Sequence, residues 1–248
     1  MVECPILLLH GLGVDHRMWA LQSGALQKRG QVLAPDLPGF GRQPPLPREH
    51  RSPAAYADWV ATWLTDQGVG PAAVMGYSMG GSIALLLALR HPQRVRSLIL
   101  CCSSACWGRG GRRWVGRVFA GLGGRAAMEL FQGTVAWSCT RLLPGSRRDE
   151  VADMVRRAHR PTMQSLYLGL TALDLTPFLG QLDLPARVIG GNHDWLAPPS
   201  HLRALARGLP RGRLHLVAGA GHLLCLSHST RFTQLLSRGL AEPASPGS

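Results

Sequence analysis

Residues 74–83, VMGYSMGGSI, place Ser78 between Gly76 and Gly80. The spacing Gly-x-Ser-x-Gly is that of a nucleophile elbow, in which a serine occupies a sharp turn between a strand and a helix. The alternative is an incidental serine in a glycine-rich turn. Apolar runs precede and follow the pattern (AAV and IALLLAL), as the elbow requires, and they favour a nucleophile. The backbone N–H of Met79, at the start of the predicted helix, is then a candidate donor to an oxyanion.

A serine nucleophile needs a general base, and the base needs a carboxylate to orient it. Among the acidic residues between Ser78 and the last histidines, only Asp194 directly follows a predicted strand, in ARVIGGNHDWLAP. His222 follows the last predicted strand, in VAGAGH. The order Ser78, Asp194, His222 is the order of nucleophile, acid and base expected with an elbow of this kind. Of the other histidines, His201 falls in a predicted helix and His215 in a predicted strand. His228 lies about two helical turns after His222 and is the rival base.

A second oxyanion donor is expected from the segment LLLHGLGVDHRMW, where Leu12 stands between Gly11 and Gly13. The small neighbours allow this backbone to approach the serine, so we predict that the N–H of Leu12 acts together with that of Met79. His10 ends the preceding apolar run and is predicted to fix the loop by hydrogen bonding. This chemistry calls for no metal and no cofactor.

Six apolar runs of strand length alternate with segments of helical spacing, which predicts an α/β fold with a parallel sheet covered by helices on both faces. The expected strands are 6–9, 31–34, 72–75, 95–101, 186–190 and 213–217. The expected helices are 18–29, 53–67, 79–90, 200–207 and 230–240. Because the carboxyl ends of parallel strands share one edge of the sheet, these elements would bring Asp194 and His222 to the same side as Ser78.

The alternation breaks between Ser103 and Leu182, where amphipathic segments appear without a strand. A plain helical crossover needs only about 15 residues, so we predict that 104–182 forms a helical cap inserted between two strands. Residues 1–103 and 183–241 would form the core, and the Pro-, Ser- and Gly-rich tail 242–248 is expected to be disordered. Aromatic residues of the cap would line an apolar acyl pocket or pack the cap onto the core: Trp107, Phe119, Phe131 and Trp137.

The chain has 248 residues and carries 27 Lys and Arg against 14 Asp and Glu, a formal net charge of +13. Lys28 is its one lysine, and the arginines are scattered without a basic helix or an aromatic–basic motif, which argues against specific nucleic-acid binding. No apolar run approaches the roughly 18 residues of a membrane span, and no basic leader opens the chain, so a cytoplasmic location is expected. The six cysteines lack the spacing of zinc sites or of a disulfide framework.

The motifs HGLG, DLPGFGR, GYSMGG, HPQRV, GGNHDWLAP and GAGH together resemble the α/β-hydrolase superfamily over residues 6–240. The resemblance implies Ser78, Asp194 and His222 as a catalytic triad, with Leu12 and Met79 at the oxyanion hole. Members of the superfamily usually begin with an antiparallel hairpin before the HG strand. Here that strand begins almost at the N-terminus, so we expect the hairpin to be reduced or absent and the sheet to have about six strands.

Within the superfamily, LLLHGLG, LAPDLPGFGR and AGAGHLLCLSHSTRF most resemble the methyl ester esterases of the biotin pathway. This resemblance implies a serine esterase that cleaves carboxylic esters through an acyl-enzyme, with the methyl ester of pimeloyl-acyl-carrier protein as its substrate. The excess of arginine in the cap fits docking of an acidic acyl-carrier protein, and equally an ordinary charged surface. The alternatives are a general short-chain carboxylesterase, an enol-lactone or C–C bond hydrolase and, remotely, a non-catalytic binding protein of this fold.

Overall fold

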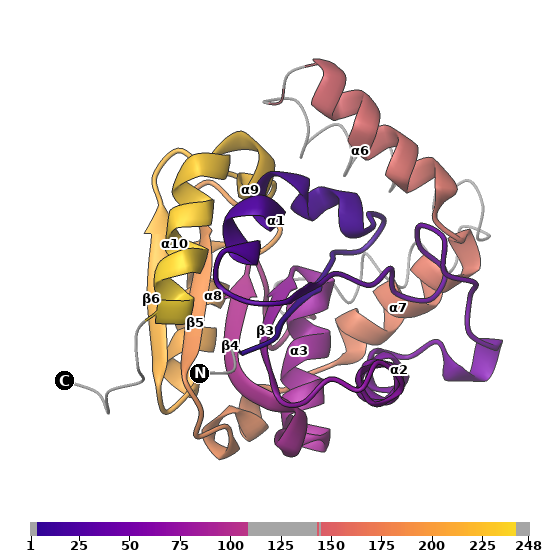
Figure 1. Cartoon of the computed structure of the whole chain (residues 1–248), viewed down its shortest axis with the longest axis horizontal. Coiled ribbons are helices and arrows are strands. Elements are labelled where there is room, and N and C mark those ends of the chain that lie inside the picture. The colour runs from indigo at the N-terminus through magenta and orange to yellow at the C-terminus, as the bar shows by residue number, and fades with distance from the viewer. Residues whose placement is uncertain (1–3, 109–142, 144, 242–248) are drawn as a thin grey trace.

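The computed structural model describes residues 4–108, 143 and 145–241 (Figure 1). Six strands form one sheet in the order β2-β1-β3-β4-β5-β6, and every neighbouring pair is parallel. The strands are β1 (Ile6–Leu9), β2 (Val32–Leu33), β3 (Ala72–Tyr77), β4 (Val95–Cys101), β5 (Ala186–Gly191) and β6 (Gly212–Val217). The predicted α/β fold and its parallel sheet of about six strands are therefore confirmed.

Helices cover both faces of this sheet, as predicted (Figure 1). The α-helices are α1 (Ala20–Gln27), α2 (Pro53–Asp66), α3 (Met79–Arg90), α6 (Gly145–Arg157), α7 (Arg160–Ala172), α8 (Pro199–Gly208), α9 (Leu224–Ser227) and α10 (Ser229–Ala241). The described residues also form four short 3-10 helices: η1 (His16–Trp19), η2 (Arg48–His50), η3 (Pro92–Arg94) and η4 (Thr176–Gln181). None of the described helices is both long and apolar enough to cross a bilayer.

The alternation of side chains along each strand divides the core into two layers. On β1, Leu7 and Leu9 belong to the cluster formed with α2, α3 and α8. Ile6 and Leu8 belong to the opposite cluster, which contains buried residues of α1, α9 and α10. Because both faces of β1 and β3 are buried, these strands consist of unbroken apolar runs, and their positions were predicted to within two residues.

Two expected elements are wrong in their extent. The predicted strand 31–34 keeps only Val32–Leu33, because it lies at the edge of the sheet and pairs with β1 through two residue pairs. The predicted helix 18–29 is divided into η1 and α1. Asp15 accepts a hydrogen bond from the N–H of Arg17 and thereby caps a tight 3-10 turn before the α-helix begins.

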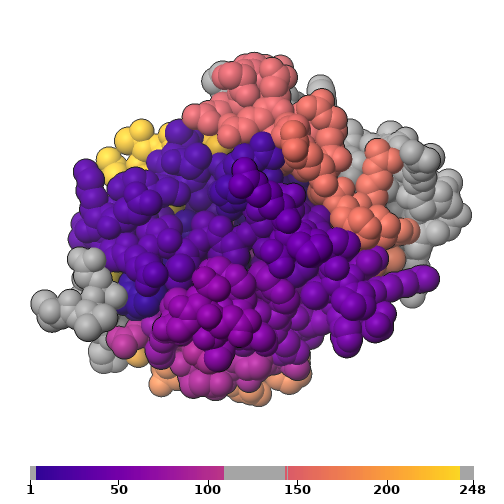
Figure 2. Space-filling model, turned by 45° about the vertical axis from the view of Figure 1, so that its right-hand side comes forward, coloured from indigo at the N-terminus to yellow at the C-terminus, as the bar shows by residue number. Residues whose placement is uncertain are grey.

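The described part of the predicted insertion places α6 and α7 in the chain between β4 and β5. Figure 1 shows α6 on the outside of the molecule, with α7 between it and the region of α2. In Figure 2 the salmon residues of α6 lie against the indigo N-terminal part of the chain. The insertion therefore contacts segments that are distant from it in sequence, as a cap would.

Gly80, in the first turn of α3, lies directly against β1. A Cβ atom built on it would stand 2.3 Å from the carbonyl oxygen of Leu9 and 2.7 Å from that of His10, both backbone atoms. We expect Gly80→Ala to lower the free energy of unfolding by about 1–3 kcal/mol, measured by urea denaturation.

Gly24→Ala is the matched control for Gly80→Ala. Gly24 lies inside α1, and a Cβ built there meets no atom within 4 Å. This variant should be stabilised by about 0.5–1 kcal/mol, since alanine is the better helix former. Equal effects of the two substitutions would contradict the close approach of α3 to β1.

Candidate active site

Ser78 occupies the one-residue turn between β3, which ends at Tyr77, and α3, which begins at Met79. Its backbone has φ 53° and ψ −114°, a conformation that side-chain-bearing residues rarely adopt. Two hydrogen bonds hold it there. The N–H of Ser78 donates to the carbonyl of Cys101 at 2.8 Å, and the hydroxyl of Ser103 donates to the carbonyl of Ser78 at 2.8 Å. The strain is therefore balanced by contacts with β4 and the residues after it.

The side chain of Ser78 lies next to a histidine, which in turn contacts a carboxylate. His222 Nε2 lies 3.1 Å from Ser78 Oγ, and His222 Nδ1 lies 2.8 Å from Asp194 Oδ2. Asp194 is almost fully buried, and its other oxygen accepts from the N–H groups of Leu196 and Ala197, each at 2.9 Å. The structure thus brings together the three residues predicted from the sequence. In this geometry the imidazole can accept the serine proton while the carboxylate holds its Nδ1–H.

Tyr77 supports the same histidine from behind, a contact that the sequence analysis missed. Its hydroxyl donates to the backbone carbonyl of His222, and the two rings meet edge to face with centroids 6.0 Å apart. Burial raises the pKa of Tyr77 well above its usual value, so the phenol stays a donor. The available signal was the position itself, because a tyrosine that ends a buried strand needs a partner for its hydroxyl.

Cys102, the residue after β4, faces the same group of side chains. Its sulfur lies within 4.8 Å of the carboxylate oxygen of Asp194 and the imidazole nitrogen of His222. Burial raises the pKa of the Cys102 thiol well above its usual value. The thiol is therefore neutral, and it packs as a small, fully buried side chain.

The loop of residues 10–15, between β1 and η1, carries the predicted second oxyanion donor. It lies against the nucleophile turn, because a Cβ built on Gly11 would be 3.5 Å from Ser78 Cβ. Leu12 is partly buried and packs against the core. Its N–H and that of Met79, which begins α3, remain the proposed donors. An N–H in the first turn of a helix has no partner within the helix and is available to an anion.

His10 is fully buried and fixes this loop, as predicted. Its Nε2 accepts the N–H of Leu37 at 2.9 Å, while its Nδ1 donates to the carbonyl of Gly11 at 2.9 Å. Both ring nitrogens are therefore used by the backbone in the neutral form. Burial lowers the pKa of His10, against the smaller opposing effects of the Gly11 hydrogen bond and the Asp36 charge.

This depressed pKa predicts a loss of stability in acid. The unfolded chain takes up a proton on His10 as the pH falls through about 6.5, whereas the folded chain does so only at lower pH. The free energy of unfolding should therefore fall by up to about 1.4 kcal/mol per pH unit within that window. His10→Gln should remove this part of the slope below pH 6.5, measured by urea denaturation. His50→Gln, at an exposed position, should leave the slope unchanged, and parallel curves for all three proteins would refute the assignment.

The remaining predicted residues lie as follows. Trp107 is partly buried against the core, and its Nε1 donates to the hydroxyl of Ser82 at 2.8 Å. Phe119, Phe131 and Trp137 lie outside the described residues. The rival base His228 is partly buried after the end of α9, where its Nδ1 lies 2.9 Å from the hydroxyl of Ser227.

The sequence matches the family described as the α/β hydrolase fold over residues 5–229. It is 32% identical to a pimeloyl-[acyl-carrier protein] methyl ester esterase of Aeromonas hydrophila over 241 residues, 93% of each chain. It is 28% identical to a 2-hydroxymuconate semialdehyde hydrolase of Pseudomonas putida over 264 residues, 96% of this chain and 87% of the other. The solved structure of a thermophilic esterase from Thermogutta terrifontis superposes with a TM-score of 0.86 at 27% identity, covering 98% of this chain and 91% of that one.

Proposed function

The chain belongs to the α/β hydrolase fold family, and from that premise we propose that Ser78, His222 and Asp194 form the catalytic triad of a carboxylic ester hydrolase. The observation that carries the proposal is the line of contacts from Ser78 Oγ through His222 to the buried Asp194. A binding protein of the same fold would have no need of a nucleophile in a strained backbone conformation or of a base within hydrogen-bonding distance of it.

The reaction proceeds in two steps. Ser78 Oγ attacks the ester carbonyl as His222 Nε2 takes the hydroxyl proton, and the N–H groups of Leu12 and Met79 donate to the oxyanion. When the tetrahedral intermediate collapses, the imidazolium gives its proton to the departing alkoxide, which leaves as the alcohol. A water activated by His222 then attacks the acyl-enzyme, which releases the carboxylic acid and restores Ser78.

We propose a methyl ester of a carrier-bound dicarboxylic acyl chain as the physiological substrate. The support is the similarity to the Aeromonas protein, whose name states hydrolysis of a pimeloyl-[acyl-carrier protein] methyl ester. The similarity to the Pseudomonas hydrolase, named for 2-hydroxymuconate semialdehyde, favours C–C bond hydrolysis as the second candidate. General short-chain carboxylesterase activity is the third. A carrier-bound substrate would agree with the expected cytoplasmic location.

A single set of rate measurements separates these candidates. The purified protein is assayed with methyl pimeloyl-acyl-carrier protein, with p-nitrophenyl esters of two to twelve carbons, and with 2-hydroxymuconate semialdehyde. We expect the highest kcat/KM for the carrier-bound ester, together with rescue of a biotin auxotroph that lacks its methyl ester esterase. Efficient short-chain turnover without rescue would indicate a general carboxylesterase, and preferred cleavage of the semialdehyde would indicate a C–C bond hydrolase.

Docking of an acidic carrier protein is part of this proposal. The described cap helix α6 exposes the guanidinium groups of Arg156 and Arg157, whose side chains are 73% and 66% exposed. Attraction between opposite charges at a surface weakens as salt is added. The kcat/KM for the carrier-bound ester should therefore fall more steeply with ionic strength than that for the free methyl ester. Equal salt dependence of the two substrates would contradict docking at a basic surface.

A further inference from the structure

The loop of residues 10–15 touches both described cap helices as well as the nucleophile turn. A Cβ built on Gly13 would stand 3.1 Å from Met163 Cε of α7 and 3.7 Å from Val155 Cγ2 of α6. Val14 belongs to the same buried cluster as Val151 and Met154 of α6. The backbone that carries the proposed Leu12 donor is therefore packed between the sheet and the cap, and its position depends on where the cap sits.

Asp15 ends this loop and is itself fixed by Arg17. The Asp15 carboxylate is only 1% exposed, and it accepts from the backbone N–H of Arg17 and from two of its guanidinium nitrogens at 2.7–3.1 Å. A guanidinium that meets both oxygens of a carboxylate in this way is held in orientation as well as in position. The end of the loop and the start of η1 are therefore one rigid unit.

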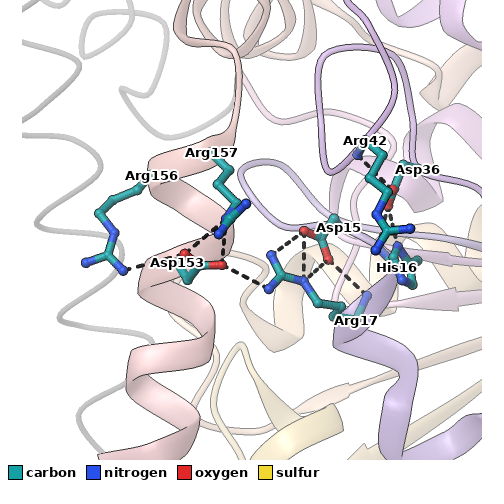
Figure 3. Close-up of polar contacts among 8 residues, drawn as sticks. All are labelled: Asp15, His16, Arg17, Asp36, Arg42, Asp153, Arg156 and Arg157. Atoms are coloured by element: carbon teal, nitrogen blue, oxygen red, sulfur yellow. Dashed lines mark hydrogen bonds and ion pairs between the residues drawn. The ribbon is translucent and has the colours of Figure 1, made fainter.

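The remaining nitrogen of the same guanidinium, Nη1, contacts the cap helix α6 (Figure 3). Arg17 Nη1 donates to Asp153 Oδ2 of α6 at 2.9 Å, between side chains that are 34% and 28% exposed. On its outer side Asp153 also pairs with Arg157, four residues later on the same helix. Arg17 thus links two carboxylates that lie 138 positions apart in the sequence. Asp15 ends the loop that carries the proposed Leu12 donor, and Asp153 belongs to the cap helix α6.

We propose that Arg17 is a positioning residue that links the position of the cap helix α6 to that of the loop of residues 10–15. The N–H of Leu12 is then correctly placed only when α6 is packed against this loop. This inference rests on the proposed ester hydrolysis and adds a link between cap and chemistry that the triad does not provide. An oxyanion donor acts on the transition state more than on the bound substrate. Breaking the link should consequently reduce kcat and leave KM almost unchanged.

Asp153→Asn tests the link with the least damage, because it removes the negative charge on α6 that Arg17 contacts and leaves the buried Asp15–Arg17 pair intact. With p-nitrophenyl butyrate, a neutral ester, we expect kcat to fall about tenfold, a fraction of the 10²–10³ that a complete oxyanion donor supplies, with KM within twofold of the parent. Glu150→Gln is the matched control. It removes a carboxylate charge from the same helix, where Glu150 pairs with Arg147, and should leave kcat unchanged.

Two further measurements separate positioning from mere stability. High salt should lower kcat of the parent towards that of Asp153→Asn and should have little effect on the variant, because the bridge is partly exposed. Asp153→Glu, which keeps the carboxylate, should recover a large part of kcat. Thermal unfolding of each variant is followed in parallel. A loss of melting temperature in Asp153→Asn without loss of kcat would overturn the proposal, and so would an equal loss of kcat in Glu150→Gln.

The outcome is distinguishable from a failure of the proposed function. If the parent and Ser78→Ala cleave the ester at the same rate, the proposed serine chemistry fails, and the coupling fails with it. If the parent is active, depends on Ser78 and is matched in kcat by Asp153→Asn at all salt concentrations, only the coupling is overturned.

Discussion

Ser78→Ala is expected to reduce kcat for ester hydrolysis by about 10⁴–10⁶, because removal of the nucleophile of a triad leaves only binding and oxyanion stabilisation. The folded structure should survive the substitution. Alanine has the same Cβ as serine in the positive-φ turn, and the backbone hydrogen bonds of Ser78 to Cys101 and Ser103 do not use its hydroxyl. The measurement is the initial rate with p-nitrophenyl butyrate, accompanied by the melting temperature.

Ser227→Ala is the control for this loss. Ser227 lies at the end of α9, and its hydroxyl donates to the carbonyl of Leu223 at an exposed site. Its substitution should leave the rate unchanged. A Ser78→Ala protein that keeps the parent's rate would remove the serine from the mechanism and return the chain to the class of non-catalytic binding proteins of this fold.

Asp194→Asn is expected to reduce kcat by about 10⁴ while KM changes little, and the hydrogen bonds of Asp194 give the reason. One carboxylate oxygen accepts from the N–H groups of Leu196 and Ala197, and the other faces Nδ1 of His222. In the variant, the amide oxygen must stay on the two N–H groups, so the amide NH₂ faces the imidazole. His222 then has to carry its proton on Nε2, where it cannot accept the proton of Ser78.

The measurement that checks this tautomer argument is the rate of acylation of Ser78, followed as the burst of p-nitrophenol, compared with the steady-state KM. Asp183→Asn, at an exposed position shortly before β5, is the matched control and should not change the burst. A burst rate of Asp194→Asn within tenfold of the parent would show that the carboxylate does not set the state of the imidazole.

The sequence predicted the three candidate catalytic residues because their placement follows from local patterns. Asp194 and His222 each come shortly after a predicted strand, and parallel strands bring such positions to one edge of the sheet. Ser78 lies between an apolar strand and an apolar helix, and that context raised its five-residue motif above chance. The positions of β1 and β3 were predicted equally well, since strands buried on both faces are continuous apolar runs, whereas the edge strand β2 is shorter than predicted.

The contacts that hold these residues in place could not be predicted in the same way. Tyr77 donates to a carbonyl 145 positions away, and Arg17 meets Asp153 across 136 positions. Neither pair has a characteristic spacing, because each exists only once separate elements have packed together. Trp107 illustrates the same limit. Its type suggested either an apolar pocket or packing of the cap onto the core. In the structure it is partly buried against the core, and its indole N–H donates to the hydroxyl of Ser82 on α3.

The two edges of the sheet offer very different amounts of backbone to another molecule. At one edge β2 is two residues long, too short to guide a further strand. At the other edge β6 runs for six residues, and within the described chain it pairs with β5 alone. A strand of that length can nucleate edge-to-edge aggregation, which proteins commonly oppose with charge. Here the exposed Arg213 on β6 and the net charge of +13 make a second copy of the chain an unfavourable neighbour, so colloidal stability is supplied by electrostatic repulsion.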